Sequence, residues 1–174
     1  MAHILKLRGL SPKWGEGTWM AENATLVGDV VMGRDCSLWF HAVVRGDVNA
    51  IRMGDRVNVQ DGAVIHCTYQ RTQTHIGNDV SIGHNAIVHG CVVEDRVLLG
   101  MGSIVMDNAL VRSETLVAAG AVLLEGTKTE SGYIYAGVPA KRIKKIDAEV
   151  KGILERTARN YIQYAGWFKN PESA

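Results

Sequence analysis

Residues 76–105, IGNDVSIGHNAIVHGCVVEDRVLLGMGSIV, carry an aliphatic residue at nearly every sixth position. The series consists of Ile76, Ile82 and Val88 and, after a slip, of Val93, Leu99 and Val105. A period of six fits neither an α-helix nor a strand with two alternating faces. It predicts a solenoid in which each hexapeptide forms one short strand and one turn, and three strands close a triangular coil of about 18 residues. The aliphatic residues then point into the prism, where each stacks on its counterpart in the next coil.

The same period extends in both directions from this stretch, over about residues 20–125. The further members are Leu26, Met32, Leu38, Val44, Met53, Val59, Ile65, Val111, Val117 and Leu123. A chance alignment of strands in a β-sandwich would not keep this register over so long a segment. The pattern resembles the hexapeptide-repeat family, and the resemblance implies a left-handed parallel β-helix. The predicted fold class is therefore mainly β, a left-handed parallel β-helix with a C-terminal α-helix.

The flanking segments complete one predicted domain, residues 1–174, in which the β-helix occupies about residues 21–125. Residues 1–20 look irregular, and Trp14 and Trp19 are expected to cover the first coil. The segment 133–141 reads as a connector because it contains glycine and proline. A helix is predicted at about residues 147–168, with Asp147 as its N-cap and an apolar face that packs along the prism.

Composition narrows the class of protein further. Hydrophobic residues make up 47% of the 174, the net charge is +1 and the pI is near 7.8, which gives no indication of a nucleic-acid or membrane partner. No apolar run approaches the roughly 18 residues of a membrane span. The chain has three cysteines, an odd number, and no stretch in it resembles a signal peptide. Both observations favour reduced thiols and a cytoplasmic location.

Three histidines stand close to two breaks in the period: His66, His84 and His89. Counting hexapeptides puts His84 about one coil above His66 on the same side, with His89 on an adjacent face. A metal ion needs ligands that converge at about 2.1 Å. One straight prism does not aim three side chains at one point, whereas two neighbouring prisms can. We therefore expect all three histidines to bind one metal ion between subunits, and three prisms around a threefold axis would form three equal sites.

The histidines and two polar turns together resemble the γ-class carbonic anhydrases. The motifs are Ile65-His66, Gly83-His84, His89-Gly90, Arg45-Gly46-Asp47 and Gln60-Asp61-Gly62. The resemblance implies a homotrimer with Zn²⁺ or Fe²⁺ at each subunit interface. It also implies that His66 and His89 come from one subunit and His84 from its neighbour. The implied reaction is the reversible hydration of carbon dioxide to bicarbonate by a hydroxide on the metal.

Other positions match the family singly. By resemblance, Arg45 and Asp47 form an ion pair across the subunit interface. Gln60 lies near the metal-bound water, and Asp61 takes part in orienting that water. In the C-terminal helix, Tyr161 matches a tyrosine near the site, and Tyr164 is the second choice.

One departure from the family concerns proton release. The fast archaeal prototype has an acidic residue directly after its aspartate and an acidic loop. Here Val48 follows Asp47, and the short loop Cys67–Thr74 contains no acid. His75 is the nearby substitute for that relay. These features predict slow proton release, so that the activity is low.

Two other functions are compatible with the sequence. The segment Ala136–Lys141 resembles the connector of hexapeptide-repeat acyltransferases, which suggests an acyltransferase or thioesterase acting on a coenzyme A thioester. A non-catalytic trimer stabilised by its metal is the other. Cys67 and Cys91 stand beside the histidines, and we interpret them as buried fillers rather than ligands.

Overall fold

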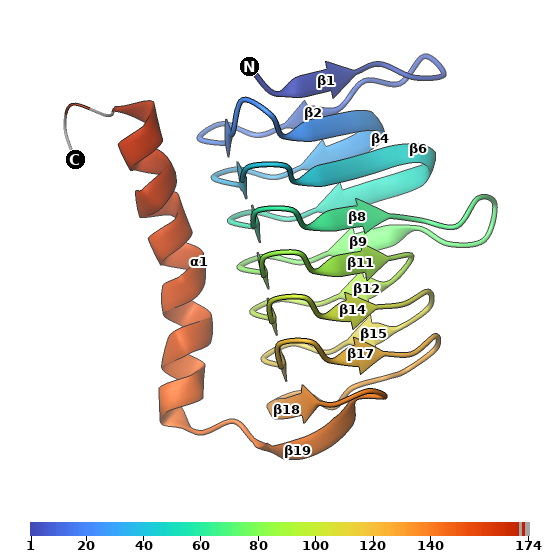
Figure 1. Ribbon diagram of the computed structural model, residues 1–174, viewed down its shortest axis with the longest axis vertical. Coiled ribbons are helices and arrows are strands. Elements are labelled where there is room, and N and C mark those ends of the chain that lie inside the picture. Colours follow the sequence, from blue (N-terminus) through green and yellow to red (C-terminus); the bar gives the residue numbers. More distant parts are fainter. Residues whose placement is uncertain (171, 173–174) are drawn as a thin grey trace.

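The computed structural model describes residues 1–170 and 172. The chain forms the predicted left-handed parallel β-helix of about seven coils, with one helix alongside it (Figure 1). Short strands line three flat faces, and all strand pairs between successive coils are parallel. The stacking of coils thus follows from the six-residue period of the sequence.

The three faces are named by the order in which each coil visits them after the turn that carries His84. The first face contains β1 (His3–Leu5), the first parts of β4 (Thr25–Met32) and β6 (Val43–Met53), β8 (Val64–His66), β11 (Ile87–His89), β14 (Ile104–Val105) and β17 (Val122–Leu123). The second contains β2 (Lys13–Trp14), the second parts of β4 and β6, β9 (Thr74–Ile76), β12 (Val92–Val93) and β15 (Leu110–Val111). The third contains β3 (Trp19–Met20), β5 (Ser37–Leu38), β7 (Asn58–Val59), β10 (Ser81–Ile82), β13 (Leu98–Leu99), β16 (Leu116–Val117) and β18 (Tyr133–Ala136).

The core is a set of aliphatic columns inside the prism. On the first face, six residues in register are fully buried: Leu26, Val44, Ile65, Val88, Val105 and Leu123. On the third face, Leu38, Val59, Ile82, Leu99 and Val117 form an equivalent column. Each member removes its neighbours' apolar surface from water, so the columns hold the coils in register.

Two segments differ from the sequence-based expectation. Residues 1–20 contain three strands, and β1 pairs with β4, so this segment forms the first coil instead of an irregular cover. Trp19 packs on Trp39, with ring centroids 4.9 Å apart, while Trp14 is 45% exposed and covers little. The expected connector at 133–141 includes β18, which pairs with β16, and runs into the antiparallel strand β19 (Lys141–Lys145). These strands lie outside the series of aliphatic residues that runs from Leu26 to Leu123, so the six-residue period does not mark them.

The helix α1 (Ala148–Lys169) packs against the third face and runs back toward the first coils (Figure 1). Asp147 caps it by accepting a 2.9 Å hydrogen bond from the backbone N–H of Val150. Near the C-terminal end, the Phe168 ring lies against Trp19 and Trp39. This aromatic cluster fixes α1 over β3 and β5. Within the described residues, no helix has both the length and the apolar character to cross a membrane.

The aliphatic columns predict a large effect for truncating one of their members. Leu99 is 0% exposed and lies between Ile82 and Val117 in its column. We expect Leu99→Ala to lower the free energy of unfolding by about 2–5 kcal/mol, because the stacked coils cannot close the cavity. The matched control is Ile143→Ala in β19, where the side chain is 59% exposed, with an expected change below about 0.5 kcal/mol. Equal effects in urea denaturation would contradict the stacked core.

Candidate metal centre

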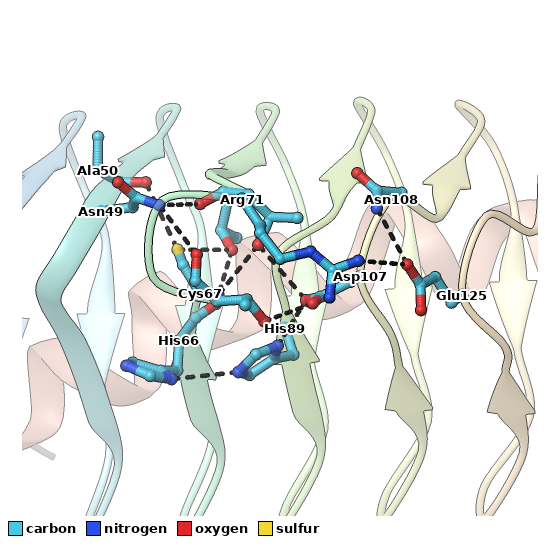
Figure 2. A network of polar contacts seen from close by, with 12 residues as sticks. Asn49, Ala50, His66, Cys67, Arg71, His89, Asp107, Asn108 and Glu125 are labelled. Carbon is cyan, nitrogen blue, oxygen red and sulfur yellow. Dashed lines mark hydrogen bonds and ion pairs between the residues drawn. The ribbon is translucent and has the colours of Figure 1, made fainter.

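Two of the three histidines form a pair at the edge between the first and second faces, with ring planes inclined by 59°. His66 ends β8, His89 ends β11, and the two are register partners although 23 residues separate them in sequence. Nδ1 of His66 lies 3.1 Å from Nε2 of His89, and Figure 2 shows the two rings facing each other. The coil repeat therefore brings two ring nitrogens together without any contribution from another element.

Each of the three histidines has a carboxylate on one ring nitrogen. Nε2 of His66 lies 2.9 Å from Asp47, Nδ1 of His89 lies 2.6 Å from Asp107, and Nδ1 of His84 lies 2.9 Å from Asp61. A carboxylate accepts the ring N–H, so the other nitrogen of each neutral ring keeps a lone pair. Carboxylates placed in this way are the usual partners of metal-binding histidines.

The facing nitrogens of His66 and His89 fit a shared cation. If both N–H groups are donated to Asp47 and Asp107, two lone pairs meet across 3.1 Å, and a cation between them would relieve their repulsion; in the other tautomer of one ring the same contact is a hydrogen bond. Burial is the main cause that lowers the pKa of His66 and outweighs its hydrogen bond to Asp47, so the ring is neutral near pH 7. Two ligands of a tetrahedral zinc ion, at about 2.0–2.1 Å from it, lie about 3.3 Å apart. The observed pair is therefore close to the spacing that such an ion requires.

His84 lies away from this pair, which corrects the expected placement. Hexapeptide counting put His84 above His66 and His89 on another face, whereas His66 and His89 share an edge. His84 follows β10 and occupies the edge between the third and first faces. The reason is the loop Cys67–Thr74, which adds residues outside the coil and was counted as part of it (Figure 1). Within the described part of this single chain, no group of three His, Cys, Asp or Glu side chains could hold a metal ion.

Gln60, Asp61 and Tyr161 gather around His84 instead of around the pair. Gln60 is only 4% exposed, and its side-chain amide donates a 3.0 Å hydrogen bond to Asn58. Gln60, His84 and Tyr161 line one pocket of about 350 Å³ between α1 and the third face. Burial raises the pKa of Tyr161 to about 12, so its hydroxyl stays a hydrogen-bond donor. The carboxylate of Asp61 lies 2.9 Å from Nδ1 of His84, and its expected part in orienting a metal-bound water stays a prediction.

The other tyrosine considered for this role lies outside the pocket lining. Tyr164 packs its ring on that of Trp167, with centroids 4.9 Å apart. Of the two tyrosines, Tyr161 is therefore the one that can contact a ligand beside His84.

Arg45 and Asp47 lie within the long strand β6 and not at a turn. Alternate residues of a strand point to the same side, and Arg45 forms an ion pair with Asp47 of its own chain. Their expected pairing across a subunit interface stays a prediction. Burial tends to raise the pKa of Asp47, but hydrogen bonds from His66 and Arg45 outweigh it and hold that pKa below its usual value. Asp47 is thus kept ionised as the acceptor for His66.

Asp107 is a functional candidate that the sequence analysis missed. It accepts hydrogen bonds from His89 and from Thr68 of the loop Cys67–Thr74. Asn49 holds the same loop by donating hydrogen bonds of 2.9 and 2.8 Å to the carbonyls of Thr68 and Thr72. Figure 2 shows Asn49, His89 and Asp107 in this network. These hydrogen bonds outweigh burial and keep the pKa of Asp107 below its usual value. The signal that could have found it is its position two residues after Val105, at the same edge one coil further on.

The remaining candidates do not join the site. His75 lies in β9 and not in the loop, is the register partner of Val92, and is exposed, with its ring 3.3 Å from the side chain of Gln73. Cys67 and Cys91 are buried free thiols. Burial raises the pKa of both, that of Cys91 to about 12, which keeps them neutral. They act as small core residues beside the pair.

Comparison with known proteins assigns the family. The chain is 36% identical over 89% of its length to gamma carbonic anhydrase 2 of Arabidopsis thaliana. It is 32% identical over 95% of its length to a carbonic anhydrase of Geobacillus kaustophilus and spans 91% of that protein. The chain belongs to the γ-class carbonic anhydrase-like proteins. The chain spans 58% of the Arabidopsis relative's own length. No family model matches the chain.

Solved structures agree on the fold. A hexapeptide transferase family protein from Anaplasma phagocytophilum superposes with a TM-score of 0.89 at 37% identity, over 94% of this γ-class-like chain and 96% of the other. The N-acyltransferase AntD of Bacillus cereus superposes with a TM-score of 0.66 at 14% identity, over 85% of this chain and 91% of the other. At that identity the second likeness shows the shared fold alone.

The contact between His89 and Asp107 predicts a loss of metal affinity when the carboxylate is removed. We expect Asp107→Ala to weaken zinc binding by about 10–100-fold, because His89 loses the acceptor that sets its tautomer and orientation. Competition with a chromophoric chelator measures the affinity. Glu125→Ala is the matched control, since this exposed acid binds Arg71 instead of a histidine and its removal should leave zinc binding unchanged. Unchanged affinity in Asp107→Ala would show that the carboxylate does not support the ligand.

Proposed function

We propose that the protein is a metal-dependent enzyme that catalyses the reversible hydration of carbon dioxide. The observation that carries this proposal is the set of three histidines, each held by a carboxylate, of which two present facing nitrogens 3.1 Å apart. Membership of a family with relatives named carbonic anhydrase supports the same reaction. The metal ligands are His66 and His89 of one subunit and His84 of its neighbour.

The outer surface of the first face supports assembly with copies of the same chain. Its outward residues in five successive coils are all apolar and incompletely buried: Val43, Val64, Ile87, Ile104 and Val122. The helix α1 covers the third face and not this one. A continuous apolar stripe of this kind marks an interaction surface, and a homotrimer would bury it.

A threefold arrangement would also complete the metal centre. The first face has the pair His66 and His89 at one edge and His84 at its other edge. If this face points toward a threefold axis parallel to the prism, the first edge of each chain meets the second edge of the next chain. His84 and His89 belong to the same coil, so rotation about that axis leaves them level. Each of three interfaces would then gather three imidazole ligands.

The residues around the ion would prepare it for carbon dioxide. A bound Zn²⁺ or Fe²⁺ would act as a Lewis acid that brings the pKa of a water molecule close to neutrality. Asp47, Asp61 and Asp107 hold the three rings in one tautomer. Gln60 and Tyr161 present an amide and a hydroxyl beside His84, where they can orient water and substrate.

Proton release and location complete the proposal. The loop Cys67–Thr74 offers no carboxylate for passing protons to solvent. His75, exposed on the second face, is the remaining titratable side chain that follows this loop, so the rate of hydration is expected to be low. The three buried free thiols suit a reducing compartment, and we assign the protein to the cytoplasm.

The direct test measures carbon dioxide hydration by protein loaded with zinc and, without air, with ferrous iron. We expect a rate above buffer with at least one metal, and its loss in His66→Ala, His84→Ala and His89→Ala together with stoichiometric metal binding. The reason is that removing one of three ligands leaves too few to hold the ion. Full metal content in any variant would remove that residue from the ligand set, and no rate with either metal would remove the reaction.

A mixing experiment tests the shared site separately. A chain with both His66→Ala and His89→Ala retains His84, and a His84→Ala chain retains the pair. Neither should bind metal alone. Refolded together in equal amounts, they should regain about a quarter of the sites, because that share of interfaces in a cyclic trimer combines the two intact edges. Absence of any recovery in trimers shown to contain both chains would place all three ligands within one chain and contradict the proposal.

A further inference from the structure

The strand β19 lies at the opposite end of the prism from the N-terminus, and one of its edges has no strand partner (Figure 1). In the described part of the chain it pairs with β18 alone, in antiparallel orientation. Ile146, directly after the strand, donates its backbone N–H to the carbonyl of Gly132. Because alternate residues of an antiparallel pair turn to opposite sides, the N–H and C=O of Lys145 point to the open edge. The edge therefore presents backbone groups that another strand can bind.

The side chains of β19 give this edge a strong positive charge. Four of its five residues are lysine or arginine, and all five are exposed. Arg142 and Lys144 form ion pairs with acids of their own chain. Lys141 and Lys145, the first and last residues of the strand, have no acidic partner among the described residues. Ile143, the one apolar residue of the strand, is 59% exposed. The edge thus combines unpaired cations with one apolar contact.

We infer that β19 binds an extended acidic segment of a partner protein, which adds to the sheet as a further strand. The backbone of the segment would pair with the open edge, and its carboxylates would lie near Lys141 and Lys145. In such additions the main-chain hydrogen bonds supply affinity and the side chains supply specificity. A segment in which acids alternate with small apolar residues fits best, because strand side chains point alternately to two sides and Ile143 supplies an apolar contact.

Other occupants fit this edge less well. A second copy of β19 would place cations opposite cations, which destabilises a strand pair. A lipid surface would leave the backbone groups of the edge without hydrogen-bond partners. A single-stranded nucleic acid needs aromatic rings on which its bases stack, but Arg142 already covers the adjoining ring of Tyr133, with its guanidinium carbon 4.8 Å from the ring centroid. The same charges that oppose pairing between copies therefore favour an acidic strand.

The test uses a fluorescein-labelled octapeptide of alternating glutamate and valine, titrated with the full chain and followed by fluorescence anisotropy. We expect saturable binding that weakens as salt is added, because exposed charges are screened. A chain with both Lys141→Glu and Lys145→Glu should bind about tenfold more weakly, since two attractions become repulsions. The matched control carries Lys6→Glu and Lys13→Glu, which make the same change in net charge on exposed residues near the other end of the prism. This control should keep the wild-type affinity.

A second peptide separates strand addition from simple attraction of charge. With every backbone nitrogen methylated, it keeps its carboxylates but has no N–H to donate, so we expect most of the affinity to be lost. Equal binding of the two peptides would overturn the inference, as would equal binding of the first peptide to the two double variants, both shown to be folded by circular dichroism. Binding of phosphatidylserine vesicles or of a single-stranded DNA oligonucleotide more tightly than the peptide would also overturn it.

Discussion

The in-register stacking of inward-facing aliphatic residues is the constraint on which the rest of the structure depends. Ile65 and Val88 are fully buried register partners, so the residues that follow them are held one coil apart, at about 4.8 Å between strands. His66 and His89 are those residues. Their rings face each other because the core beneath them has no freedom to move them apart. The hydrophobic column therefore fixes the spacing of the polar residues above it, and the positions of two candidate metal ligands follow from that packing.

The loop between these two coils shows how an insertion is accommodated without disturbing the stacked core. Residues that do not fit the coil leave it as the loop Cys67–Thr74, while Ile65 and Val88 still stack. The expelled loop is not free, since Asn49 binds two of its carbonyls and Thr68 binds Asp107. Asp107 in turn orients His89. An insertion that could have weakened the edge instead supports the carboxylate on which a histidine depends.

The sequence predicted the features that repeat along the chain, and it did not reveal the strands and contacts that lie outside the repeat. A six-residue period was enough to predict the β-helix, because every repeat places an aliphatic residue at the same inward-facing position. The strands β1 and β19 lie outside the period, so residues 1–20 and 133–141 were not recognised as part of the sheets. The histidines were identified by type and motif, but their edges were misplaced because a loop length was counted as coil. Asp107 was missed because its relation to His89 exists only across stacked coils, and no local pattern records it.

The division of candidate ligands between two edges would link metal binding to assembly. One edge offers His66 and His89 with their carboxylates, and the other offers His84 with Asp61, so a single chain presents at most two converging ligands. Two imidazoles hold an ion weakly compared with three, and in the proposed trimer the third ligand would come from a neighbouring chain. Part of the free energy of metal binding must then appear as stability of the assembly. The apolar stripe of the first face and the ion would stabilise the same interface. Burial of the stripe does not depend on the exact orientation of the chains. The ion would contribute only when the two edges place all three histidines around it.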